Sequence, residues 1–125
     1  MMTRADINRN YVRPDITPET IIEYFSIRGG VSFVELQNYF EGVKGDFDWG
    51  NAKLNIWFWF GMSEQSIRVL QSALDTDVLK MTPTSLFVYL ADGSIPRVPI
   101  AKRVQKYKTE RWVPVVFNRG EGFPS

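Results

Sequence analysis

The chain has 125 residues, of which 44% are hydrophobic and 14% aromatic, and its net charge is +1 at pH 7. This length is typical of one domain, and this composition excludes a disordered chain, which would have fewer aromatic residues and a larger net charge. No apolar run approaches the ~20 residues that a membrane-spanning helix needs, because the longest covers only residues 56–60.

The sequence contains neither cysteine nor histidine. The missing cysteine excludes disulfides, thiolate metal sites and cysteine nucleophiles. The missing histidine removes the commonest general base and the commonest metal ligand. We therefore expect a protein that is not an enzyme, with no catalytic residues, no metal, no cofactor and no small-molecule substrate.

The first three quarters of the chain are acidic and the last quarter is basic. Residues 1–93 contain eight Lys/Arg and 12 Asp/Glu, whereas residues 94–125 contain seven Lys/Arg and two Asp/Glu. We therefore expect an N-terminal arm over 1–16, a domain over 17–93 and a basic C-terminal extension over 94–125. The segment Met1 to Arg13 is polar and has no apolar signal-peptide core, so we expect a cytoplasmic or nuclear protein without a membrane partner.

Three helices are predicted in the first two thirds of the chain. The first follows Thr17 as N-cap and ends at Gly29 and Gly30, because glycine adopts the left-handed conformation of a helix C-terminus. The second covers 33–41, after the capping-box spacing of Ser32 and Glu35. The third covers 64–74, after a Ser cap. Residues 42–55 are expected to be a loop, and residues 56–62 either a buried strand or a short buried helical turn.

A β-hairpin is predicted next. Residues 78–81 and 86–90 have strand-like composition and flank a turn that contains Pro83. Residues 100–111 could be a short basic helix or an extended arm. Residues 112–117 have strand-like content that is interrupted by Pro114, and residues 118–125 are expected to fray.

The order of helix, helix, helix and hairpin is that of a winged helix, an α+β fold. Residues 21–25, 29–36, 66–74 and 86–90 resemble winged-helix domains of the LOTUS type and the N-terminal domain of Egalitarian-like RNA-localisation proteins. The resemblance covers residues 17–93. It implies a non-catalytic interaction module in RNA regulation that binds a protein partner, since some members of this family dock an RNA helicase and others are proposed to bind RNA.

The third helix would be the recognition helix if the protein were instead a DNA-binding regulator. Its polar face offers Gln65, Arg68 and Gln71. Residues 15–93 nevertheless contain only five Lys/Arg against 11 Asp/Glu, a net charge of −6 that would repel duplex DNA. A solvated helix face is the alternative interpretation.

The basic segment near the C-terminus is the candidate site for single-stranded RNA. Clustered cations bind phosphates, and aromatic rings among them stack on unpaired bases. The alternatives are a solvated tail and a binding surface for an acidic protein partner. The candidate RNA-binding residues are Lys102, Arg103, Lys106, Tyr107, Lys108, Arg111 and Trp112.

The aromatic run 57–60 is the candidate protein-binding surface, with Trp57 and Trp59 as partner-binding residues. A strand or helix cannot bury every ring of such a run against one surface, and exposed aromatic side chains are enriched at interfaces. The alternative is that another part of the chain covers them. Leu70 and Leu86 are expected to be core residues that join the third helix to the hairpin.

Overall fold

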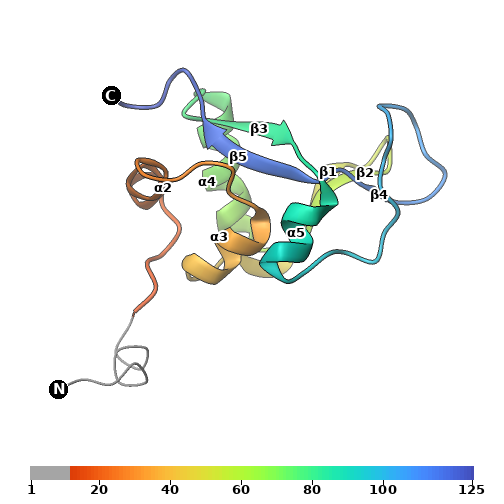
Figure 1. Ribbon diagram of the computed structural model, residues 1–125, viewed down its shortest axis with the longest axis horizontal. Helices are drawn as coiled ribbons and strands as arrows, with labels where there is room; N and C mark the ends of the chain where they lie inside the picture. Colours follow the sequence, from red (N-terminus) through yellow and green to blue (C-terminus); the bar gives the residue numbers. More distant parts are fainter. Residues whose placement is uncertain (1–11) are drawn as a thin grey trace.

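The computed structural model describes residues 12–125, which form an α+β domain of four helices and five strands (Figure 1). The elements follow one another as α2 (Pro18–Phe25), α3 (Phe33–Tyr39), β1 (Lys44–Asn51), β2 (Ile56–Met62), α4 (Glu64–Asp75), β3 (Leu79–Pro83), α5 (Leu86–Asp92), β4 (Arg111–Trp112) and β5 (Val115–Arg119). Most of the expected N-terminal arm, residues 1–11, lies outside the described residues. The last residue of that arm, Ile16, is buried in the core.

The three predicted helices are confirmed as α2, α3 and α4, and each begins at the predicted cap. The expected end of the first helix at Gly29 and Gly30 is wrong, because α2 ends at Phe25 with Ser26 as its C-cap. The hydroxyl of Thr17 accepts a hydrogen bond from the backbone N–H of Thr20 at 3.1 Å. Ser32 and Ser63 accept equivalent bonds at the starts of α3 and α4. These side chains satisfy N–H groups that the first turn of a helix leaves without partners.

The expected loop over residues 42–55 is wrong in part, because residues 44–51 form strand β1. β1 pairs antiparallel with β2, and β2 pairs parallel with β4, so the aromatic run is the central strand of a three-stranded sheet. The strand alternative for residues 56–62 is therefore correct. The glycines that suggested a loop allow close strand contact: a Cβ on Gly50 would lie 2.4 Å from the carbonyl oxygen of Ile56.

The predicted hairpin wing is not formed. Residues 86–92 are helix α5 rather than a strand, and β3 pairs antiparallel with β5, far along the chain. The local reason is capping. The Ser85 hydroxyl accepts from the N–H of Phe87, and Gly93 ends the helix with a φ of 101°. These caps prevail over the strand preference of the aromatic and β-branched residues between them.

The end of the chain is part of the domain and not an appended extension. Val31 and Phe117 exchange two backbone hydrogen bonds, of 3.0 and 2.8 Å. Beyond β5, the N–H of Gly120 donates to Val78 and that of Gly122 to Asp77. Residues 118–125 are therefore attached to the exit of α4, and the expectation that they fray is wrong for this part.

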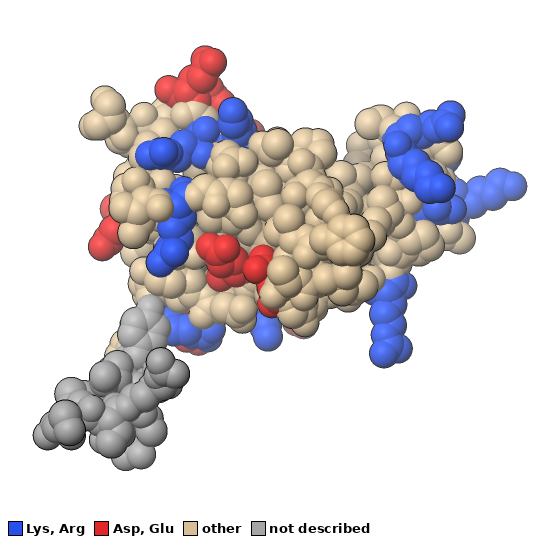
Figure 2. Space-filling view, in the orientation of Figure 1, with Lys and Arg blue, Asp and Glu red and all other residues tan. Residues whose placement is uncertain are grey.

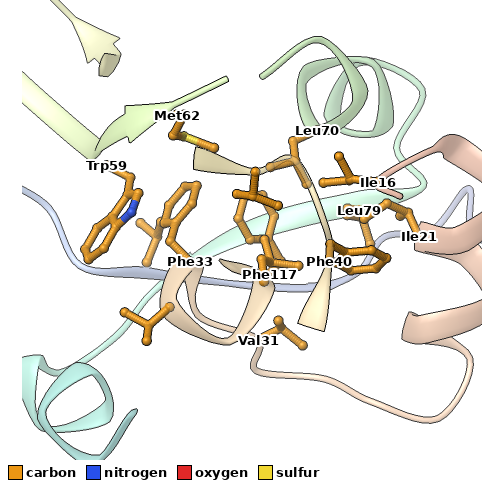
Figure 3. Packing of buried hydrophobic residues seen from close by; sticks show 14 of the residues in the cluster. Ile16, Ile21, Val31, Phe33, Phe40, Trp59, Met62, Leu70, Leu79 and Phe117 are labelled. Atoms are coloured by element: carbon orange, nitrogen blue, oxygen red, sulfur yellow. The ribbon is translucent and has the colours of Figure 1, made fainter. Parts of the chain in front are cut away.

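One hydrophobic core joins these elements. Figure 3 shows Phe33 of α3 between Trp59 of β2 and Phe117 of β5, with Leu70 of α4 in the same cluster. Leu70 is fully buried, as predicted. Leu86 is only half-buried at the edge of this core, because it belongs to α5 and not to a wing strand.

Candidate nucleic-acid interface

Lys53 and the basic segment near the C-terminus come together at one end of the molecule. The hairpin tip between β1 and β2 (residues 51–55) projects beside the segment 97–111 that leads to β4 (Figure 1). The N–H of Tyr107 donates to the Leu54 carbonyl at 3.0 Å, and the N–H of Arg111 donates to the Asn55 carbonyl at 2.8 Å. The Asn55 side chain returns a 2.8 Å hydrogen bond to the Tyr107 carbonyl. We call residues 51–55 and 97–111 together the basic end.

The part of segment 97–111 for which the sequence predicts a short basic helix or an extended arm, residues 100–111, forms neither. It has no helix or strand up to β4, and it is folded back on itself. The Tyr107 hydroxyl donates to the Arg103 carbonyl at 2.9 Å, and the Arg111 guanidinium lies 4.9 Å from the centre of the Tyr107 ring. The Tyr107 side chain therefore contacts both Arg103 and Arg111 within this loop.

The basic end carries most of the positive charge of residues 12–125. Figure 2 shows Lys and Arg side chains projecting from this end of the molecule, and no acidic group at that end in the same view. Glu110 is its single acidic residue, and the other described residues contain six Lys/Arg and 12 Asp/Glu. Its seven basic residues are Lys53, Arg97, Lys102, Arg103, Lys106, Lys108 and Arg111.

An apolar groove runs between the sheet and this loop. It has a volume of about 390 Å³ and is open to solvent. The side chains of Leu54, Ile56, Phe58 and Val113 line it from the sheet side, and residues 101–104 line it from the loop side. Lys102 and Arg103 thus lie at the edge of an apolar surface.

The structure confirms the exposure of only some predicted RNA-binding residues. Lys102, Arg103, Lys106 and Lys108 are exposed. Trp112 is 2% exposed, and its indole N–H donates to the Phe58 carbonyl at 3.1 Å, so the prediction that it stacks on RNA is wrong. Tyr107 and Arg111 are half-buried against each other, which removes one face of the Tyr107 ring from any ligand.

The predicted partner-binding tryptophans do not form an exposed surface. Trp59 is 6% exposed and packs against Phe33, Tyr89 and Trp112 in the core, so its assignment is wrong. Trp57 is half-buried. Tyr89 of α5 and Trp112 of β4 cover the Trp59 ring, and neither contact was expected from sequence.

The polar face of α4 is exposed, but its side chains are bonded to other groups of the same domain. Arg68 forms an ion pair with Glu64 one turn earlier. Gln71 donates to Asp75 at 3.0 Å, and Gln65 donates to the Ile16 carbonyl at 3.3 Å. α4 also lies apart from the basic end (Figure 1), so the two candidate nucleic-acid surfaces do not combine.

Lys53 and the groove are not predicted by the sequence. Lys53 is separated from the basic segment by more than 40 residues, and only the docking of segment 97–111 on the hairpin tip brings them together. Its position in a Gly/Asn-rich turn is the one signal that could have suggested an exposed tip.

A second exposed surface is apolar and lies on α5. Phe87 and Leu90, one helical turn apart, are 72% and 49% exposed, and Ile95 just beyond the helix is 43% exposed. Helix α5 was not predicted, so this surface was not among the candidate sites.

No family model, no curated protein and no solved structure matches this chain. Among the described residues, no helix has the length and apolar character needed to cross a membrane. Within residues 12–125, acidic side chains do not gather in groups of three or more that could hold a metal ion.

Proposed function

We propose that this protein is a non-catalytic module that binds RNA through its basic end. The observation that carries the proposal is the gathering of seven Lys/Arg and one Glu on two chain segments that are hydrogen-bonded to each other. Phosphate contacts dominate the affinity of proteins for nucleic acids. Because the other described residues carry a net charge of −6, a phosphate backbone would be attracted to this end and repelled elsewhere.

The choice of RNA and of a regulatory role rests on the resemblance of residues 17–93 to LOTUS-type domains. The winged-helix fold remains a prediction. The described elements place a hairpin before α4, and β3 pairs with β5. The non-catalytic role is supported by a sequence without cysteine or histidine.

The alternative of a DNA-binding regulator has less support. A recognition helix needs cations and free hydrogen-bonding groups on its exposed face. On α4 the only cation, Arg68, is paired with Glu64, and Gln71 is bonded to Asp75.

A protein partner is the second candidate, as the LOTUS resemblance implies. The observation that favours it is the exposed pair Phe87 and Leu90 on α5, since apolar and aromatic side chains form the centres of interfaces. This surface replaces Trp57 and Trp59 as the candidate partner-binding surface.

The test compares two variants of equal net charge. One replaces four cations of the basic end by alanine: Lys102, Arg103, Lys106 and Lys108. The other replaces four exposed cations elsewhere by alanine: Lys44, Arg68, Lys80 and Arg119. RNA affinity is measured as a function of salt concentration for the parent and both variants, and thermal melts check their folding.

We expect the basic-end variant to lose about tenfold or more in affinity and to show a shallower salt dependence. Both changes follow because a protein with fewer phosphate contacts releases fewer counterions from the RNA when it binds. The matched variant should bind nearly as the parent does. The opposite pattern, with loss only in the matched variant, would place binding outside the basic end, and Arg68→Ala alone would then test α4. A parent without affinity for RNA at low salt would refute the proposal and leave the α5 surface as the basis for function.

A further inference from the structure

The groove at the basic end combines an apolar lining with cations at its edge. Ile56 and Phe58 lie two residues apart on β2 and therefore face the same side of the strand. Leu54 and Val113 extend this apolar floor, and Val104 projects from the opposite wall with 86% of its surface exposed. A side chain as exposed as Val104 contributes little to the core, so folding alone does not explain an apolar residue among cations.

The chemistry of the groove defines its occupant. Lys102 and Arg103 line the groove itself, and Lys53 stands on the adjoining hairpin tip. A ligand that matches both features has a planar face that packs on apolar side chains and an anion a few bonds away. A nucleotide has this structure, and the volume of about 390 Å³ is within the range of small-ligand sites.

We propose that this groove takes an unpaired nucleobase, while Lys102 and Arg103 contact the phosphates on either side of it. The inference rests on the proposed function and goes beyond it by naming the groove as the place where an unpaired base binds. It also replaces Tyr107 and Trp112 by Leu54, Phe58, Val104 and Val113 as the residues that contact the base.

A preference for single strands follows from the geometry. In a duplex both faces of a base are stacked, and extruding it costs free energy that an unpaired base does not require. The lining is mainly aliphatic, so it should accept any base with little sequence preference.

The experiment removes the apolar lining at constant charge. In one variant Leu54 and Val104 are both replaced by serine, and in a second only the exposed Val104 is replaced, which keeps the test valid if the double variant does not fold. The matched control is Ile27→Ser, because Ile27 is 81% exposed and lies after α2, outside the basic end. Each protein is titrated with a single-stranded RNA 12-mer, with an abasic 12-mer of the same phosphate backbone and with a duplex.

We expect the parent to bind the base-bearing strand about fivefold or more tightly than the abasic strand, the usual contribution of one base contact. The serine variants should lose this difference while their affinity for the abasic strand stays unchanged, and Ile27→Ser should behave as the parent. A 4-thiouridine in the RNA should crosslink to the peptide that contains Phe58 or to residues 101–104.

Equal affinity of the parent for base-bearing and abasic strands would overturn this inference and leave RNA binding through the basic end intact. A duplex bound as tightly as the single strand would overturn it as well. If the parent bound none of the three ligands, the proposed function would fail first.

Discussion

Tyr89 of α5 is fully buried, and its hydroxyl connects three elements. It donates a hydrogen bond to the carbonyl of Val115 in β5 at 2.6 Å and accepts one from the N–H of Phe33 in α3 at 3.2 Å. Burial raises the pKa of Tyr89 above its usual range, so the hydroxyl keeps its proton and remains a donor. A polar group in this position fixes how α5 packs against the ends of two other elements.

Replacing Tyr89 by phenylalanine should lower the free energy of unfolding by about 1–3 kcal/mol, because it leaves two buried backbone groups without their partner. Denaturant unfolding followed by circular dichroism measures the change. Tyr107→Phe is the matched control, because it removes the same hydroxyl from an exposed position. That hydroxyl bonds only to Arg103, so its loss should change the free energy of unfolding little. Equal losses for both variants would show that the Tyr89 hydroxyl has no special structural role.

Individual aromatic residues also show where sequence reasoning fails. Trp112 and Tyr107 lie among lysines in the sequence, a pattern that is typical of nucleic-acid binding. Trp112 is in the core because β4 pairs in parallel with β2, a contact between residues more than 50 positions apart. The composition of a short segment cannot reveal such a contact.

At the level of elements, α5 shows that short capping signals can decide between helix and strand. Its residues favour a strand by composition. Ser85 and Gly93 mark the two ends of a helix, and the left-handed conformation of Gly93 allows the chain to turn away after Asp92. Both signals are present in the sequence, and they prevail over the aromatic and β-branched content of the residues between them.

We predict that Gly93→Ala will destabilise the protein by about 1–2 kcal/mol, the usual cost of a left-handed conformation for a residue with a Cβ. No steric clash should contribute, since a Cβ at this position meets nothing within 4 Å. Gly93→Asn is the control and should cost less, because asparagine adopts this conformation more readily. Thermal or chemical unfolding measures both, and a larger loss with Asn would contradict the helix end described here.

At the level of the whole molecule, the chain closes on itself. β5 pairs with β3 and touches Val31, and Phe117 lies at the centre of the core (Figure 3). The boundary expected at residue 93 therefore separates β3 from β5, its hydrogen-bonded partner strand. The charge asymmetry that suggested this boundary is real, but it describes an exposed loop within the fold.

A chain that ends at residue 93 should consequently fail to fold. It lacks β4 and β5 and exposes the buried faces of Phe33 and Trp59, which pack on Phe117 and Trp112. The expected result is a circular dichroism spectrum without a cooperative melt. Removing only the two exposed residues 124–125 should leave the melting temperature nearly unchanged. A cooperative melt of the 1–93 chain would restore the boundary predicted from sequence.

The sequence by itself determined the features that depend on neighbouring residues. The starts of α2, α3 and α4 follow from Thr17, Ser32 and Ser63, whose hydroxyls reach backbone groups three positions away. The burial of Leu70 follows from helical periodicity. The excess of lysine and arginine near the C-terminus is likewise a property of the sequence.

Only the tertiary structure decided which distant segments meet. The pairing of β3 with β5, the burial of Trp59 and Trp112, and the groove between the hairpin tip and segment 101–104 all join residues far apart in the chain. Such contacts form because burying the combined apolar surfaces offsets the entropy of closing long loops. That balance depends on the whole chain, so no local pattern of residues could predict it.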